Sequence, residues 1–265
     1  MLAEKVSGNA LEIVPVGAFK DNYVWTLRNA RHAAVVDPGD ARPVLDYLER
    51  EKLELCAILA THHHADHVGG VAQLLERWKV PVYGPRKEPI PTLTHPVSEG
   101  DEVAIPQLGA SASFSVLDIP GHTRAHIAYY GAGALFCGDT LFACGCGRLF
   151  EGTAPQMYAS LQKLVALPDD TKVYCGHEYT LANIGFAKAV EPRNGALAER
   201  EARDRRLRDA GRPTLPSTLG EEKATNPFLR CSEPAVIESA NKYLGSRLSD
   251  PVRVFAAIRD WKNTF

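Results

Sequence analysis

The stretch ATHHHADHVGG at positions 60–70 constrains the fold more than any other part of the chain. It gathers four of the nine histidines and one aspartate within six positions, directly after the apolar run CAILA. Because residues two apart on an extended segment share a face, His62 and His64 point the same way. Asp66 and His67 then project near the start of a helix that VGGVAQLLERW predicts. The chain must therefore fold so that a strand ends where polar side chains converge.

Three later apolar runs end in the same manner, each with a glycine directly before one polar residue. FSVLDIPGH ends at His122, ALFCGD at Asp139 and KVYCGH at His177. A glycine at this place allows a tight turn, and turns along one sheet edge bring their side chains together. Imidazole and carboxylate groups suit a borderline divalent ion such as Zn²⁺, and seven such groups are too many for one tetrahedral centre. The pattern predicts two metal ions.

The seven side chains divide between two ions, with one carboxylate shared. One ion is predicted to bind His62, His64 and His122, the other to bind Asp66, His67 and His177, and both to share Asp139. Two ions about 3.5–4 Å apart hold a bridging water and lower its pKa toward about 7, which supplies hydroxide at neutral pH. The sequence therefore predicts a metal-dependent hydrolase. Zn²⁺ is the first expectation, and iron or Mn²⁺ suit the same donors.

Element type and charge both change along the chain, which predicts two domains. Up to residue 178, short β-rich runs alternate with a few amphipathic helical stretches, whereas from Tyr179 onward the strands stop and four helical stretches follow. Residues 193–265 carry 14 Lys and Arg against 10 Asp and Glu, while the preceding part is net acidic. We expect an α/β catalytic domain over 1–178 and a helical domain over 179–265.

The composition is that of a soluble globular protein, with 45% hydrophobic and 23% charged residues. The first twenty residues lack the features of a secretory signal, and no segment approaches the roughly 20 apolar residues of a membrane span. We expect a cytoplasmic monomer without a membrane partner. The six cysteines lie mostly in apolar runs, which favours buried, reduced thiols over disulfides. Cys144 and Cys146 are interpreted as part of a packed turn.

Several stretches make the chain similar to a known family. THHHADH matches the H-x-H-x-D-H signature of the metallo-β-lactamase superfamily, and the three later ligands fall in the order that the superfamily uses. DNYVW, GDTLFACGCGRLFEGT, CGHEYT and NPFLR resemble glyoxalase II, the hydroxyacylglutathione hydrolases. The resemblance implies an αββα metallo-β-lactamase sandwich followed by a C-terminal helical domain that helps to bind glutathione. It also implies hydrolysis of S-D-lactoylglutathione to D-lactate and glutathione, the second step of methylglyoxal detoxification.

The same resemblance implies roles for individual residues. Asp66 and Asp139 are the expected catalytic residues, with Asp66 orienting the hydroxide in addition to binding metal. The expected contacts with the glutathione thioester, a small-molecule substrate, are Arg148, Tyr179, Arg259 and Lys262. Phe150 stands where the family commonly has a tyrosine, so that hydroxyl is missing here. The two helical cations are three residues apart and share a helix face, which suits the two carboxylates of glutathione.

Other polar residues have simpler interpretations. Structural, supporting or surface roles are expected for His32, His63, His95 and His126. Asp37 and Asp40 in VVDPGD are interpreted first as turn residues, with support of a metal ligand as the alternative.

Other functions stay open from the sequence. A β-lactamase shares the metal motif, but it usually acts outside the cytoplasm and lacks a basic helical tail. A persulfide dioxygenase uses one iron with fewer ligands, which the second ligand set disfavours. A nuclease or nucleic-acid-binding protein would use the basic tail, yet EREARDRRLRD interleaves acids with arginines as a salt-bridged helix face does, so no nucleic-acid partner is expected. Another thioester or a lactone is an alternative substrate for the same centre.

Overall fold

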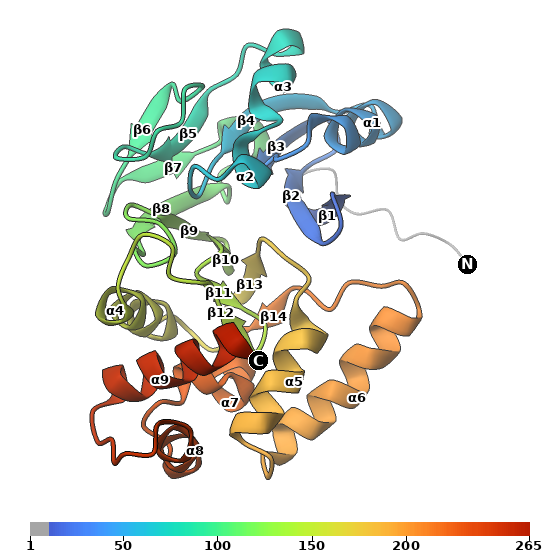
Figure 1. The fold of residues 1–265 in the computed structure, drawn as a ribbon. Helices are drawn as coiled ribbons and strands as arrows, with labels where there is room; N and C mark the ends of the chain where they lie inside the picture. Colours follow the sequence, from blue (N-terminus) through green and yellow to red (C-terminus); the bar gives the residue numbers. More distant parts are fainter. Residues whose placement is uncertain (1–10) are drawn as a thin grey trace. The chain divides into compact units, whose positions relative to one another are not determined.

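The computed structural model describes residues 11–265, so the first ten residues of the predicted catalytic domain lie outside the described part. The chain packs into two compact units. Of the described residues, the first unit comprises 11–117 together with Ile127–Ala132, and the second comprises Asp118–His126 together with Gly133–Phe265. Figure 1 colours the elements along the chain. The domain boundary expected at residue 178 was drawn from a change in element type, and it stays a prediction.

The first unit is built on a six-stranded sheet with three helices. Its strands, in sheet order, are β1 (Glu12–Ala18), β2 (Asn22–Arg28), β3 (His32–Val36), β4 (Glu54–Leu59), β5 (Val82–Pro85) and β6 (His95–Val97). The helices are α1 (Ala41–Glu51), α2 (Ala65–Val68) and α3 (Val71–Arg77). The first three strands are antiparallel, and β3 to β6 run parallel. The unit also contains β7 (Glu102–Ala104) antiparallel to β8 (Ser113–Asp118), the short helix η1 (Pro106–Leu108) and β9 (Ile127–Gly131).

Strand β4 explains why the histidine-rich stretch lies at a sheet edge. The strand is flanked by parallel β3 and β5, and its last five residues are buried, so the apolar run fills the core on both faces. Asp37 follows β3 and His62 follows β4 at the carboxyl ends of these two parallel strands. The Asp37 N–H still donates to the Leu59 carbonyl at 2.9 Å. The two polar residues therefore begin at the same edge.

The second unit contributes three strands to a second six-stranded sheet, which also contains β7, β8 and β9. β10 (Ala134–Gly138) runs parallel to β13 (Lys172–Cys175), and β13 pairs antiparallel with β14 (Ser217–Thr218). Asp139 and His177 follow the carboxyl ends of the two parallel strands. The strands β11 (Leu141–Phe142) and β12 (Gly145–Cys146) form a tight hairpin directly after Asp139. The expectation that strands stop at Tyr179 is wrong at β14, because two residues are too few to show a strand periodicity.

Helices make up most of the second unit. They are α4 (Ala154–Val165), α5 (Thr180–Val190), α6 (Gly195–Asp209), α7 (Leu219–Thr225), η2 (Pro227–Leu229), α8 (Pro234–Leu244) and α9 (Pro251–Thr264). The four predicted helical stretches correspond to α5, α6, α8 and α9, which Figure 1 shows in yellow to red. The rings of Phe186, Phe228 and Phe255 are fully buried and contact one another in series, so this unit has an aromatic core.

The arginine-rich helix α6 is stabilised largely by ion pairs. Arg200 is buried, and its Nη2 lies 2.7 Å from Glu222 Oε1 on α7. On the outer face, Arg205 pairs with Glu201 at 2.9 Å. The interleaved charges therefore form the salt-bridged helix that the sequence predicts.

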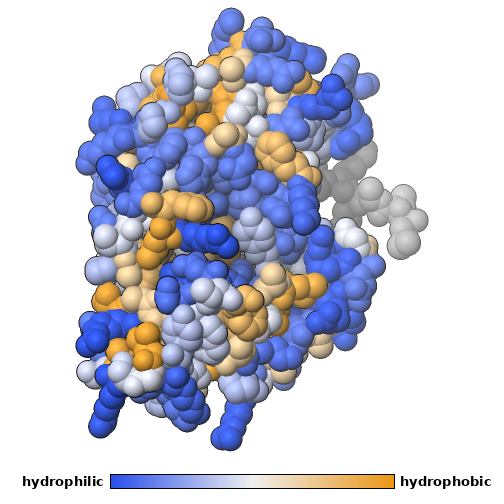
Figure 2. All heavy atoms as spheres, in the orientation of Figure 1, coloured by the Kyte–Doolittle hydropathy of each residue, from blue (hydrophilic) through white to orange (hydrophobic). Residues whose placement is uncertain are grey.

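The surface and the thiols agree with the composition. All six cysteines are buried free thiols, as expected. On the face drawn in Figure 2, hydrophilic residues are interspersed with small hydrophobic patches. Within residues 11–265, the helices are all too short or too polar to cross a membrane.

Candidate metal centre and substrate pocket

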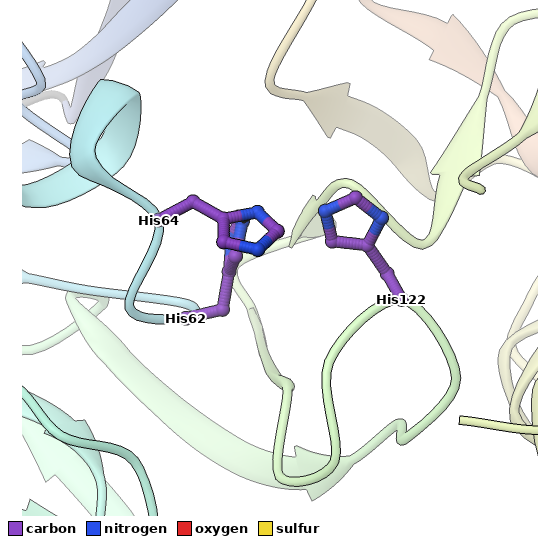
Figure 3. A group of neighbouring side chains, drawn as sticks. All are labelled: His62, His64 and His122. Carbon is purple, nitrogen blue, oxygen red and sulfur yellow. Dashed lines mark hydrogen bonds between the residues drawn. The ribbon is translucent and has the colours of Figure 1, made fainter. Parts of the chain in front are cut away.

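In the first unit, His62 and His64 leave the end of β4 with their rings against each other. His62 is fully buried, and its Nε2 lies 3.1 Å from His64 Nδ1. The other ring nitrogen, Nδ1, contacts the Thr61 hydroxyl at 3.1 Å. Figure 3 draws both rings on the segment between β4 and α2. The two imidazoles thus meet, as the sequence predicts, although β4 ends at Leu59 and a bend at residues 61–62 carries His62.

His67 is held by a buried carboxylate. Its Nδ1 lies 3.0 Å from Asp37 Oδ2, and Asp37 also accepts 2.7 Å hydrogen bonds from the Thr61 N–H and hydroxyl. A carboxylate accepts only, so His67 carries its proton on Nδ1 and presents Nε2 as a lone-pair donor. Asp37 therefore supports a predicted ligand, which was the alternative interpretation of this residue, while Asp40 caps helix α1.

Asp66 is oriented by a residue that the sequence reasoning missed. The Asn22 amide donates to Asp66 Oδ2 at 3.1 Å and approaches the Asp66 carbonyl at 3.4 Å. Asn22 lies in the DNYVW stretch, which was the only available signal. Gly39 packs against the same peptide, because a Cβ there would fall 1.8 Å from the Asp66 carbonyl oxygen. A side chain at position 39 would displace the predicted ligand.

In the second unit, one carboxylate oxygen faces two imidazoles. Asp139 Oδ2 lies 3.3 Å from His177 Nε2 and 3.6 Å from His122 Nε2. His122 Nδ1 donates to the Arg148 carbonyl at 2.9 Å, so its Nε2 also carries a lone pair. The Asp139 N–H contacts His126 Nε2 at 3.2 Å, which gives His126 the supporting role expected of it. All three predicted ligands are buried.

Several groups of these side chains can hold a metal ion. They are His62 with His64 and His122, which Figure 3 shows, Asp66 with His67 and His177, and Asp37 with His62 and His67. The first two groups have the membership of the two predicted ligand sets. The third is less suited, because the Asp37 carboxylate already accepts from Thr61 and His67. Buried imidazoles and carboxylates at this density are costly without a compensating cation, so the donor set fits divalent metal ions.

The His63 ring lies edge-on to the His64 ring, with the centroids 5.0 Å apart, and turns its Nδ1 toward a carboxylate. Its Nδ1 and its backbone N–H both contact Glu88 Oε2, at 2.5 and 2.7 Å. The carboxylate thus anchors the histidine stretch, in line with a structural role for His63.

A cavity of about 430 Å³ opens within the second unit beside two of the predicted ligands. It is lined by His122, Asp139, Phe142, Cys146, Arg148, Phe150, Tyr179, Ala182, Asn183, Arg259 and Lys262. All four residues that resemblance assigned to substrate binding therefore border one pocket. Its walls combine aromatic rings with cations.

The cations in this pocket repel one another. The pKa of Lys262 is lowered to about 8, chiefly by burial and then by the nearby charges of Arg259 and Arg148. Lys262 Nζ lies 5.0 Å from the centre of the Phe186 ring, a cation–π contact that offsets part of this cost. The pocket is thus electropositive and complementary to an anionic ligand.

Two aromatic residues extend the pocket from the predicted ligands. The Tyr179 ring stacks on His177 with the centroids 4.7 Å apart and the planes 5° from parallel. Phe150 is 62% exposed and contacts the His122 ring edge-on at 5.2 Å. The missing hydroxyl at position 150 would therefore lie at an accessible rim of the pocket.

Arg259 differs from the other pocket cations because it is 4% exposed and bonded to the chain itself. Its Nη1 donates to the Cys146 carbonyl at 2.7 Å, and its Nη2 donates to Asn263 Oδ1 at 3.1 Å. The sequence placed Arg259 beside Lys262 on a helix face, and it contained no signal for the contact with residue 146.

Comparison with known proteins agrees with this geometry. The model of the metallo-beta-lactamase superfamily matches residues 19–177, and the model of the hydroxyacylglutathione hydrolase C-terminus matches residues 178–265. The hydroxyacylglutathione hydrolase of Nitrosomonas europaea is 58% identical over 255 residues, covering 96% of this chain and 97% of the relative. The chain belongs to the hydroxyacylglutathione hydrolase family. A second family member, from Methylobacillus flagellatus, is 54% identical and covers 96% of this chain and 99% of its own length.

Solved structures extend the likeness to the wider superfamily. ETHE1 from Myxococcus xanthus has a TM-score of 0.64 and 26% identity, covering 96% of this chain and 99% of that one. TTHA1623 in a di-iron-bound form has a TM-score of 0.58 and 28% identity, covering 82% of this chain and 100% of that one. The predicted fold class, an αββα metallo-β-lactamase sandwich with a C-terminal helical domain, is confirmed.

Proposed function

We propose that this chain hydrolyses the thioester of S-D-lactoylglutathione, or of a related S-2-hydroxyacylglutathione, to the 2-hydroxy acid and glutathione. The observation that carries the proposal is the pocket of the second unit, where the buried carboxylate of Asp139 and the ring of His122 border the same cavity as Arg148 and Lys262. The names of the family members support the same reaction.

The residues proposed to hold two divalent ions are those predicted from the sequence. They are His62, His64 and His122 for one ion, Asp66, His67 and His177 for the other, and Asp139 for both. A bound pair of divalent ions lowers the pKa of water toward about 7 and polarises a carbonyl oxygen. Zinc is our first proposal for the metal, and the di-iron form of TTHA1623 supports iron as its alternative.

The chain's own residues prepare this chemistry in three ways. Asn22 orients the Asp66 carboxylate, which is proposed to direct the attacking oxygen toward the thioester carbonyl. Asp37 holds the Nδ1 proton of His67, and the Arg148 carbonyl does the same for His122, so both rings present Nε2. The buried ring of Phe142 excludes water from part of the pocket and so strengthens its charge interactions.

The glutathione half of the substrate fits the charge of the pocket. It carries two carboxylates, and Arg148 and Lys262 offer two cations on the lining. Tyr179 adds a phenol group whose ring is already positioned by stacking on His177. We propose these three residues as direct contacts. Arg259 lines the same pocket, but two nitrogens of its guanidinium already donate to the protein.

We also propose that the chain acts as a cytoplasmic monomer on a small-molecule substrate. The proposed substrate contacts all come from one unit of one chain, which supports a monomer. The ion pairs of Arg203 and Arg205 on α6 occupy charges that a nucleic acid would need. Sedimentation of the purified protein tests the oligomeric state.

The proposed reaction is tested by coupling hydrolysis to metal content. Loss of the thioester absorbance of S-D-lactoylglutathione is followed for the protein as purified, after dialysis against a chelator, and after return of Zn²⁺ or Fe²⁺. We expect turnover to disappear with the metal and to return as occupancy approaches two ions per chain. A chromogenic β-lactam and a DNA duplex serve as control substrates. Hydrolysis of either control as efficiently as the thioester, or turnover that survives metal removal, would contradict the proposal.

A further inference from the structure

The guanidinium of Arg259 on α9 is turned into the protein. Its Nη1 donates to the Cys146 carbonyl at 2.7 Å and approaches the Gly147 carbonyl at 3.5 Å. The Nη2 group donates to Asn263 one turn further along the helix, and the guanidinium carbon lies 5.2 Å from the centre of the Phe228 ring. Arg259 therefore binds the backbone at the end of the β11–β12 hairpin, and Asn263 and the Phe228 ring hold the guanidinium in place.

That backbone is packed directly against two predicted metal ligands. The Gly147 N–H donates to the Thr140 carbonyl at 3.1 Å. A Cβ on Gly147 would fall 1.9 Å from the Asp139 carbonyl oxygen and 3.1 Å from His122 Nδ1, so only glycine fits there. One residue later, the Arg148 carbonyl accepts the Nδ1 hydrogen of His122 at 2.9 Å. The position of residues 146–148 thus sets the orientation of the His122 ring.

We propose that Arg259 is a positioning residue that holds the Cys146–Gly147 backbone and, through the adjacent Arg148 carbonyl, fixes the tautomer and direction of His122 for metal binding. The inference rests on the proposed role of His122 as a metal ligand. Arginine suits this task because its planar fork can meet two acceptors at fixed angles, whereas a lysine ammonium offers one nitrogen. Groups that orient a ligating histidine typically contribute about 10- to 100-fold to metal affinity or activity.

This role differs measurably from a direct contact with substrate. A contact made equally in the ground and transition states changes KM alone, whereas misdirection of His122 changes kcat and metal affinity. We therefore compare Arg259→Ala and Arg259→Lys with the full-length wild-type chain. Arg253→Ala is the matched control, because Arg253 is an exposed arginine on the same helix and lies outside the pocket.

Three measurements are made on each protein. The first is kcat and KM for S-D-lactoylglutathione, and the second is Zn²⁺ affinity of the metal-free protein by competition with a chromogenic chelator. The third is the proton resonance of the His122 Nδ1–H in the metal-free protein, assigned from its loss in His122→Gln. We expect both Arg259 variants to lower kcat and Zn²⁺ affinity about 10-fold or more and to shift or broaden that resonance. Because Arg259 also lines the pocket, Zn²⁺ affinity and the resonance, and not KM, decide the positioning role.

Gly147→Ala tests the same connection without removing a charge. Its new methyl group would overlap the Asp139 carbonyl, so the contact between residues 146–148 and this ligand pair must shift. The variant should therefore also lower kcat and Zn²⁺ affinity and shift or broaden the His122 resonance. This variant and Arg259→Lys keep the test decisive if Arg259→Ala does not fold. The control variant Arg253→Ala should match the wild type in all three measurements.

The positioning role is overturned if the Arg259 variants raise KM while Zn²⁺ affinity and the His122 resonance stay unchanged, since that pattern identifies a substrate contact. It is also overturned if Gly147→Ala leaves all three measurements unchanged. Failure of the proposed function is separately visible: a wild-type chain that binds Zn²⁺ but does not hydrolyse the thioester refutes the substrate assignment, while affinity and resonance still report on Arg259.

Discussion

Lys262 provides the sharpest test of the substrate pocket because its charge can be removed by pH. Its pKa is lowered to about 8, first by burial and then by the charges of Arg259 and Arg148, against an ordinary value of 10.5. At pH 9 roughly one Lys262 in eleven keeps its proton, whereas at pH 7 almost all do. If the ammonium binds a glutathione carboxylate, KM should rise across this interval.

The size of the rise follows from the strength of one charged hydrogen bond. At the low end such a bond contributes about 1.5 kcal/mol, which corresponds to roughly a twelvefold ratio in affinity between the protonated and neutral forms. Combined with the fractions protonated, this ratio predicts that KM increases roughly fivefold from pH 7 to pH 9. The value of kcat should change less, because the contact is remote from the thioester carbonyl.

The assay compares wild type with Lys262→Met, which keeps the apolar stem. The variant should show a KM about twelvefold higher at pH 7 and no Lys-dependent rise toward pH 9. The amino group of the substrate also loses its proton in a neighbouring pH range. The KM–pH profile of Lys262→Met reports the effect of that amino group without the effect of Lys262. Superimposable profiles for the two proteins would refute the assignment of Lys262 as a substrate contact.

Stability supplies an independent check on the same pKa. A lysine whose pKa is lower in the folded protein binds fewer protons there than in the unfolded chain, so wild-type stability increases as pH rises from about 8 toward 10.5. Below about pH 8 the buried charge is fully destabilising. Lys262→Met should therefore unfold at a higher denaturant concentration than wild type at pH 7, and the difference should shrink by pH 9.5.

Three further changes test the metal centre and the pocket rim. Asp139→Asn keeps the shape but loses the charge shared by two cations, so elemental analysis should find fewer than two metals per chain and turnover should be lost; two metals with near-normal turnover would exclude the bridging role. Phe150→Tyr should lower KM by the equivalent of roughly 0.5–1.5 kcal/mol at constant kcat, and an unchanged KM would mean that the rim does not contact glutathione. Asn22→Ala removes the donor to Asp66, so kcat should fall about 5- to 30-fold while KM changes little, and an unchanged kcat would refute its positioning role.

The parts of the site that the sequence predicted are those set by local pattern. An apolar strand followed by glycine and one polar residue fixes where His122, Asp139 and His177 emerge, and the two-residue spacing of His62 and His64 after β4 brings their rings together. These are properties of a few consecutive residues. Parallel pairing brings the carboxyl ends of β10 and β13, and so Asp139 and His177, to one edge of the second sheet, whereas His62 follows β4 of the first sheet. The single sheet edge expected from the sequence is therefore wrong, because local pattern does not show which strands share a sheet.

The parts that escaped prediction depend on contacts between distant residues. Asn22 and Asp66 are 44 positions apart, and Arg259 and Cys146 are 113 apart, so no periodicity links them. The three-residue spacing predicts that Arg259 and Lys262 share one face of helix α9. It does not show which residues of the protein that face contacts, such as Cys146. The short β14 strand was missed because its pairing with β13 depends on a partner about 45 residues earlier.

The predicted metal ligands and the pocket cations of the second unit have different effects on the proposed reaction. Asp139 and His177 follow the ends of paired strands, whereas Arg148 and Lys262 are the long side chains that we propose to contact the glutathione half of the substrate. That half is chemically unchanged when its thioester becomes a thiol, so the cations bind substrate and product alike and cannot accelerate the chemical step. Free glutathione should therefore compete with the substrate, and Lys262→Met should weaken its inhibition by the same factor that it raises KM. A variant that raised KM but left inhibition by glutathione unchanged would show that Lys262 contacts the acyl half, which would place the thioester in the opposite orientation.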